Sequence, residues 1–167
     1  MKKGLRSIAV LALSALTLTS CTSKVEFSEF KTKATEAAGK TCEYTTAKLT
    51  GKIDDKDIGT FNFTISSRVL VPSKDPTLAN TASAVAYALA LNTYFNINVY
   101  TAADLGTGYT YYAGDAFKVE YKYTDDSKNT VTSTYEWNSI GLPTAINGKA
   151  ASSDSKSTYN VKVSYSK

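Results

Sequence analysis

The chain has 167 residues and no histidine, and its formal net charge is +4 at pH 7. Without histidine, Ser-His-Asp and Cys-His catalytic sites and His-ligated zinc are excluded. Residues 1–20 hold three of the 19 Lys and Arg and none of the 15 Asp and Glu, so the remainder is close to neutral and lacks the basic surface of a nucleic-acid-binding protein. Twelve Tyr and abundant Ser and Thr favour strands with one solvated face.

The first predicted element is an export signal. Lys2, Lys3 and Arg6 precede the apolar residues 8–18, a run shorter than the roughly 20 residues of a membrane-spanning helix. A basic start, a short apolar middle and small residues before a cleavage point are typical of a secretory signal peptide. The alternative, a buried N-terminal helix with an incidental cysteine, explains neither the cations nor the polar break after the run.

The last four residues of this element, Leu18-Thr19-Ser20-Cys21, resemble the lipobox of bacterial lipoproteins. The resemblance covers residues 1–21. It implies that residues 1–20 are cleaved as the signal peptide and that the Cys21 thiol carries fatty acyl chains such as palmitate. Two or three such chains hold a protein stably at a bilayer. The chain is therefore expected in the cell envelope, lipid-anchored on the extracytoplasmic side of the cell membrane or outer membrane.

Cleavage and acylation at Cys21 also set the expected domain organisation. Residues 21–26 are predicted to be a short lipidated tether, and residues 27–167 a single α+β domain large enough for its own core. Cys42 then has no disulfide partner, so the fold depends on packing.

A first helix is predicted over residues 27–39. Ser28 is the expected N-cap, and Gly39 is expected to end the helix. Apolar side chains at spacings of three and four give the helix one face that needs a sheet to cover it. These positions are Phe27, Phe30, Ala34 and Ala37.

A hairpin is predicted next. Residues 42–53 are rich in Thr, Tyr and Leu, residues 54–59 form a polar turn, and residues 61–71 alternate between apolar and polar side chains. Acidic residues in the turn give a partial likeness to a calcium loop. The later bidentate acid of an EF-hand is missing, so a solvated turn is favoured and no metal is expected.

A second helix is predicted from Asp75-Pro76, which supplies an N-cap acid and a proline at the first helical position, to about Leu91. Its alanine-rich body favours helix and close packing against a sheet. The predicted buried stripe is Leu78, Ala82, Val85 and Leu89.

An antiparallel meander is predicted for the rest of the chain, because apolar and polar side chains alternate and Gly, Asp and Asn mark the turns. The predicted strands cover residues 93–100, 109–112, 117–123, 131–137, 142–147 and 159–165.

This order of elements predicts an α+β fold, a curved antiparallel sheet of about seven or eight strands packed with two helices. The order is similar to that of the half-barrels of lipoprotein carriers and mycobacterial lipoproteins, although no residue motif supports kinship. A cystatin-like sheet wrapped on one helix is the main alternative.

Four aromatic side chains are the candidate ligand-binding residues. Tyr121, Tyr123, Tyr135 and Trp137 lie on adjacent predicted strands, where Tyr and Trp suit a lipid, a glycan or another amphipathic ligand. For each residue taken alone a core role is favoured, because inward-facing aromatic residues of a small sheet usually form its core. The expected function is a non-enzymatic binding module without a cofactor.

Two other functions remain open. The first is a structural or adhesive surface lipoprotein that contacts an envelope polymer or protein. The second is a histidine-free enzyme with paired carboxylates across a cleft, as in glycoside hydrolysis. The acids cluster in turns, and Glu120 and Glu136 lie on the predicted wet face, so an enzyme is not expected.

Overall fold

The structure is a computed structural model that describes residues 21–74, 78, 80–91 and 95–167. The predicted export signal in residues 1–20 and the predicted helix start at Asp75-Pro76 lie outside the described residues.

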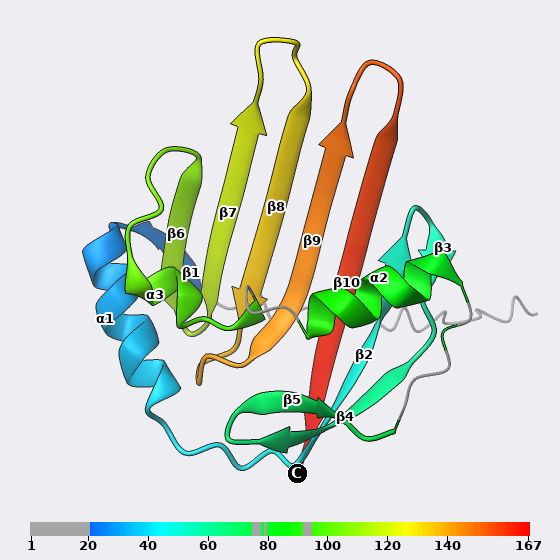
Figure 1. The fold of residues 1–167 in the computed structure, drawn as a ribbon. Coiled ribbons are helices and arrows are strands. Elements are labelled where there is room, and N and C mark those ends of the chain that lie inside the picture. The colour runs from blue at the N-terminus through cyan, green and yellow to red at the C-terminus, as the bar shows by residue number, and fades with distance from the viewer. Residues whose placement is uncertain (1–20, 75–77, 79, 92–94) are drawn as a thin grey trace, which may run out of the picture.

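One open, curved antiparallel sheet of ten strands dominates the fold (Figure 1). Its order is β1-β6-β7-β8-β9-β10-β2-β4-β5, and β3 pairs with β2 off this path. The α+β class is therefore confirmed, and the expected seven or eight strands were too few. The strands are β1 (Thr22–Val25), β2 (Thr46–Ile53), β3 (Lys56–Asp57), β4 (Phe61–Ser66), β5 (Val69–Pro72), β6 (Tyr109–Gly114), β7 (Phe117–Thr124), β8 (Thr130–Trp137), β9 (Pro143–Ala151) and β10 (Lys156–Ser166).

Helices cover one face of this sheet over part of its height (Figure 1). They are α1 (Phe27–Ala38), α2 (Thr81–Ala90) and α3 (Val99–Ala102). The core beneath them has two parts. Helices α1 and α3 pack on β6, β7 and β8 around Phe30 and Trp137, while α2 packs on β2, β4 and β10 around Leu49 and Phe63.

Helix α1 confirms the first predicted helix but not its N-cap. The cap is Glu26, whose backbone is extended and whose carbonyl accepts the Phe30 N–H at 3.0 Å. Strand β1 ends at Val25, directly before this cap, so the helix begins earlier than Ser28.

Helix α2 buries only part of the predicted stripe: Ala82 is buried, Leu78 and Val85 are not, and the side chain of Leu89 lies outside the described residues. Its described N-terminal cap is Asn80, whose Oδ1 accepts the Ser83 N–H at 2.9 Å, and the Ser83 hydroxyl donates to the Ile58 carbonyl at 3.0 Å. Leu78 and Val85 remain 46% and 44% exposed. Small side chains let the helix lie close to the sheet, and the Tyr87 ring packs against Phe61 and Phe63 of the core. The buried stripe includes Ala82, Ala86 and Ala90.

The single strand predicted over residues 61–71 is wrong, because a hairpin turn divides it into β4 and β5. Ser67 and Arg68 form this turn with φ of +49° and +67°, the signs that a type I′ turn requires at both positions. The Arg68 guanidinium fixes the turn by donating to the Lys40 carbonyl at 2.8 Å and to the Ile140 carbonyl.

The strand predicted over residues 93–100 is also wrong where the segment is described, because residues 99–102 form α3. The backbone forms hydrogen bonds between residues close in sequence in place of the hydrogen bonds between strands; for example, the Val99 N–H donates to the Asn96 carbonyl at 3.1 Å. Phe95 and Ile97 are buried as their alternation suggested, but a turn followed by a helix buries them.

The segment expected to be a tether, residues 21–26, contains β1. Residues 22–25 pair with residues 111–114 of β6, and the Asp115 N–H donates to the Cys21 carbonyl at 3.3 Å. The backbone is therefore held at the sheet edge from Cys21 onward.

Two hairpins, β7–β8 and β9–β10, continue past the helices (Figure 1). We call residues 121–133 and 148–159 the open half of these hairpins, and residues 117–120, 134–147 and 160–166 the covered half. The candidate binding residues are described below by the half in which each of them lies.

Candidate functional site

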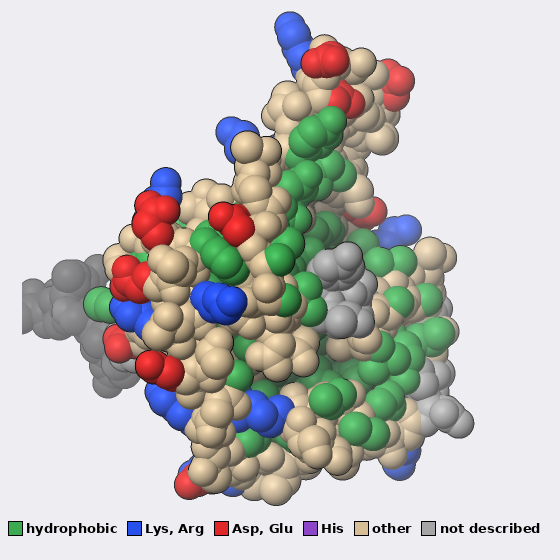
Figure 2. All heavy atoms as spheres, turned by 60° about the vertical axis from the view of Figure 1, so that its left-hand side comes forward, with side chains coloured by type: hydrophobic (Ala, Val, Ile, Leu, Met, Phe, Trp, Pro, Cys, Tyr) green, Lys and Arg blue, Asp and Glu red, His purple; other side chains and the backbone are tan. Residues whose placement is uncertain are grey.

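A row of tyrosines crosses one face of the open half. Tyr109 lies opposite Tyr121, which lies opposite Ser133, and Ser133 lies opposite Gly148, which lies opposite Tyr159. Strand neighbours across a ladder share a face, and this is the face that the helices cover further along the strands. Figure 2 shows hydrophobic side chains in a strip along the projecting part of the molecule. The core face therefore extends beyond the described helices.

The structure divides the four predicted aromatic residues between the two halves. Tyr121 is half-buried and Tyr123 is 52% exposed, and both lie on the open half. Trp137 is only 1% exposed, and its indole N–H donates to the Phe95 carbonyl at 2.9 Å. The open half thus brings Tyr121 and Tyr123 together, while Trp137 belongs to the core.

Tyr135 lies at the border between the two halves. Its ring centroid is 5.4 Å from that of Tyr100 and 6.4 Å from that of Trp137. Burial raises the pKa of the Tyr135 hydroxyl, and a hydrogen bond with Tyr100 opposes this shift. Because the hydroxyl stays protonated at neutral pH, it offers the open face a neutral polar edge.

Sequence reasoning missed Tyr159 and Tyr109. The Tyr159 ring covers Gly148 so closely that a Cβ on this glycine would lie 2.0 Å from Cζ of the ring, and the Tyr159 hydroxyl reaches Ser133 Oγ at 2.8 Å. Tyr109 packs on Tyr121 with a centroid distance of 4.7 Å. The available signal was a glycine directly after the predicted strand 142–147, because a glycine in or beside a strand often marks a position that a neighbouring group covers.

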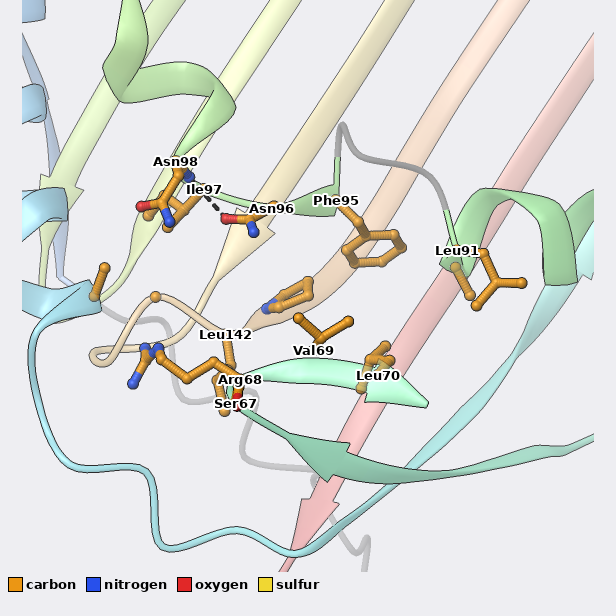
Figure 3. Close-up of a pocket in the computed structure, with 14 residues that line it drawn as sticks. Ser67, Arg68, Val69, Leu70, Leu91, Phe95, Asn96, Ile97, Asn98 and Leu142 are labelled. Atoms are coloured by element: carbon orange, nitrogen blue, oxygen red, sulfur yellow. Dashed lines mark hydrogen bonds between the residues drawn. The ribbon is translucent and has the colours of Figure 1, made fainter. Parts of the chain in front are cut away.

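A pocket of about 350 Å³ lies at the other end of the sheet (Figure 3). Its volume is within the range of about 300–1,000 Å³ that is usual for ligand sites. The lining comes from Ala38 and from residues 67–70, 90–91, 95–98 and 141–143. In Figure 3, Val69 and Phe95 point toward each other from β5 and from the segment before α3. Five segments of the chain thus build this pocket.

The opposite face of the sheet carries a polar cluster. Glu120 accepts a hydrogen bond from Lys118 at 2.7 Å and another from the Tyr112 hydroxyl at 2.8 Å. Burial, the largest single influence, raises the pKa of the Glu120 carboxyl, but these two donors outweigh it and the net shift is downward. Glu120 is therefore an ionised, ion-paired surface group.

Comparisons with protein families, with curated proteins and with solved structures each found no match for this chain. None of the described helices is long and apolar enough to cross a membrane. Within the described ranges, no group of three Cys, Asp or Glu side chains is placed to hold a metal ion. The open face and the pocket are the two candidate binding sites among the described residues.

Proposed function

We propose that this chain is a lipid-anchored, extracytoplasmic binding module without catalytic activity. The proposed ligand is a lipid, a glycan or another amphipathic molecule, held on the tyrosine face of the open half. The proposed location is the cell membrane or outer membrane, with the acyl chains of Cys21 as the membrane contact.

The anchor is supported by the position of Cys21. The residue is exposed and is not part of a disulfide, and it directly precedes an edge strand of the sheet. A thiol in this position is accessible for acylation, and chains attached there would extend away from the core.

The ligand face is supported by one observation above all: β7–β10 keep an aromatic core face after the described helices end. Tyr121 and Tyr159 are half-buried there and Tyr123 is 52% exposed. Tyrosine combines a large apolar ring with a hydroxyl that stays hydrogen-bonded, which suits ligands with an apolar body and a polar edge. A solvent-exposed apolar strip of this kind is typical of interaction sites.

The experiment is native mass spectrometry of the protein isolated from its own cells. Intact mass should show cleavage before Cys21 and added acyl chains, and the native spectrum should show a bound small molecule. The variant Tyr121→Ser/Tyr123→Ser should lose that molecule and keep the acyl chains. Tyr112→Ser, on the opposite face of the sheet, is the matched control and should retain both. An unmodified Cys21 in the intact chain would refute the anchor, and equal occupancy in all variants would refute the face.

A second candidate function is protein contact through a sheet edge. Strand β5 is an edge of the sheet, and Val69 and Val71 on it are 54% and 40% exposed. An exposed hydrophobic edge can pair with a strand of another protein. Chemical cross-linking on intact cells should detect such pairing in the unmodified chain, and Val71→Lys should abolish it.

A further inference from the structure

The pocket at the end of the sheet away from the hairpin tips has walls that combine apolar side chains with a comparable amount of polar surface. Leu70, Ala90, Phe95 and Leu142 contribute to them, and the side chains of Val69 and Leu91 are 54% and 48% exposed. Large apolar side chains that stay this exposed beside a cavity favour an apolar occupant, because its binding would remove them from water.

The charge at this pocket has one sign. Arg68 is part of the lining, whose described residues include no Asp or Glu, and none of the ion pairs formed by the described residues includes Arg68. Its guanidinium donates to the carbonyls of Lys40 and Ile140, which hold it in place without neutralising it. A guanidinium has five N–H donors, so donors remain for an anionic group.

From this combination we propose that the pocket binds a single fatty acyl chain that carries an anionic head group, with the chain between Val69, Leu91 and Phe95 and the head group beside Arg68. A volume of about 350 Å³, near the low end of the usual range for ligand pockets, fits one chain better than a bulky ring system. The proposal is independent of the tyrosine face and remains valid if that face binds nothing.

The pocket lies toward the end of the sheet that carries Cys21, so its ligand can come from two sources. The turn after β8 lines the pocket. Trp137, at the end of β8, lies opposite Phe117 of β7. Phe117 comes two residues after Asp115, whose backbone N–H donates to the Cys21 carbonyl. Pocket and Cys21 thus lie toward the same end of the sheet. The anionic chain can be a free fatty acid or an acidic phospholipid of the membrane to which Cys21 is anchored.

Trp137 provides a built-in reporter. It is the only tryptophan in the sequence, and its indole bonds to the carbonyl of Phe95, a residue of the pocket wall. Bromine atoms quench indole fluorescence at short range, so a brominated chain in the pocket should quench Trp137.

The experiment uses the full chain in phosphatidylcholine nanodiscs, titrated with bromostearate or with its neutral methyl ester. Bromostearate should quench Trp137 saturably. The ester should bind about fivefold more weakly, the difference expected from losing one partly exposed ion pair. Nanodiscs that contain brominated phosphatidylglycerol or brominated phosphatidylcholine, without added fatty acid, show whether a membrane phospholipid is the source.

Two variants block the pocket at exposed positions. Val69→Asp and Leu91→Asp should each weaken saturable quenching at least tenfold, because each places a carboxylate where the apolar chain lies. Val85→Asp is the matched control, since Val85 is 44% exposed on α2 and does not line the pocket; its binding should equal that of the unmodified chain. Far-UV circular dichroism checks that each variant is folded.

Equal quenching in the unmodified chain and in both folded pocket variants would overturn the proposal, because it would reflect partitioning of the probe into the bilayer. Absence of saturable quenching by bromostearate and by brominated phosphatidylglycerol would also overturn it. Quenching by either of these anionic probes, lost in the pocket variants, supports it.

Discussion

The covered and open halves of β7 and β8 are continuous strands with the same alternation of side chains but different surroundings. In the covered half, Val119 is fully buried and Trp137 is 1% exposed. In the open half, Tyr123 is 52% exposed and its partner Val131 is partly exposed. Alternation therefore determines which face a side chain joins, and the helices determine whether that face is core or surface.

The two halves are also stabilised differently. The covered half has helices above it, and Phe30 of α1 packs on Phe117 with a centroid distance of 6.0 Å. The open half relies on cross-strand contacts, of which the Tyr159 ring over Gly148 and its bond to Ser133 are the clearest. This contrast predicts larger mutational losses in the covered half.

The largest predicted effect is that of Trp137→Ala. Loss of the buried indole and its bond to the Phe95 carbonyl should lower the free energy of unfolding by about 3–5 kcal/mol. Tyr123→Ala, on the exposed end of the same face, should change it by no more than about 0.5 kcal/mol. Urea denaturation followed by circular dichroism measures both, and similar losses would contradict the division into halves.

Gly148→Ala comes next. Its methyl group would occupy space that the Tyr159 ring fills, so the ring must move, at a cost of about 1–3 kcal/mol. Ala150→Ser, two residues further along β9 and exposed, is the control and should change stability by less than about 0.5 kcal/mol. Thermal unfolding measures the difference, and an unchanged midpoint for Gly148→Ala would show that the ring is not fixed there.

Tyr159→Phe should cost about 1 kcal/mol, because Ser133 Oγ, which is largely buried, loses its partner. The double variant Ser133→Ala/Tyr159→Phe should be more stable than the sum of the two single losses predicts, since no unpaired hydroxyl remains. A double-mutant cycle in urea tests this, and strict additivity would show that the two groups are not coupled.

The smallest effect concerns Asp54, which links the β2 end to β10. The Thr158 backbone N–H, and then the Ser157 hydroxyl, hold the pKa of its carboxyl below the ordinary value. A lowered folded-state pKa gives stability that is present above the unfolded pKa, about 3.9, and is lost as the pH falls through the folded value. Asp54→Asn should remove this part of the acid dependence. Unfolding midpoints compared between pH 5 and pH 2 would test it, and parallel curves would contradict it.

Much of the sheet could be predicted from the sequence, because long alternating runs such as residues 117–123 and 131–137 correspond to strands. The break at Ser67 and Arg68 could not, since the pair lacks the Gly, Asn or Asp that marks a type I′ turn and the turn depends on distant carbonyls. Strand β1 was missed for a related reason: four residues form a strand only because β6 is beside them.

The candidate site was predictable only in part. Alternation placed Tyr121 and Tyr123 on the core face, but their exposure depends on where the helices end, which no local pattern indicates. Trp137 had the same pattern and lies in the core. The pocket combines one turn, two segments near helices and a second turn, and such a combination is set by tertiary packing alone.

The direct passage from Cys21 into β1 has a mechanical consequence under the proposed anchoring. With no flexible spacer, rotation of the domain relative to its acyl chains would be limited to the few bonds of Cys21 itself. The seven residue steps from Phe117 to Thr124 span about 23 Å at about 3.3 Å per residue, and β7 leads away from the anchor. The protein would thus stay close to the lipid surface, and its tyrosines could lie no further from that surface than the length of β7 and the short linkage at Cys21 allow.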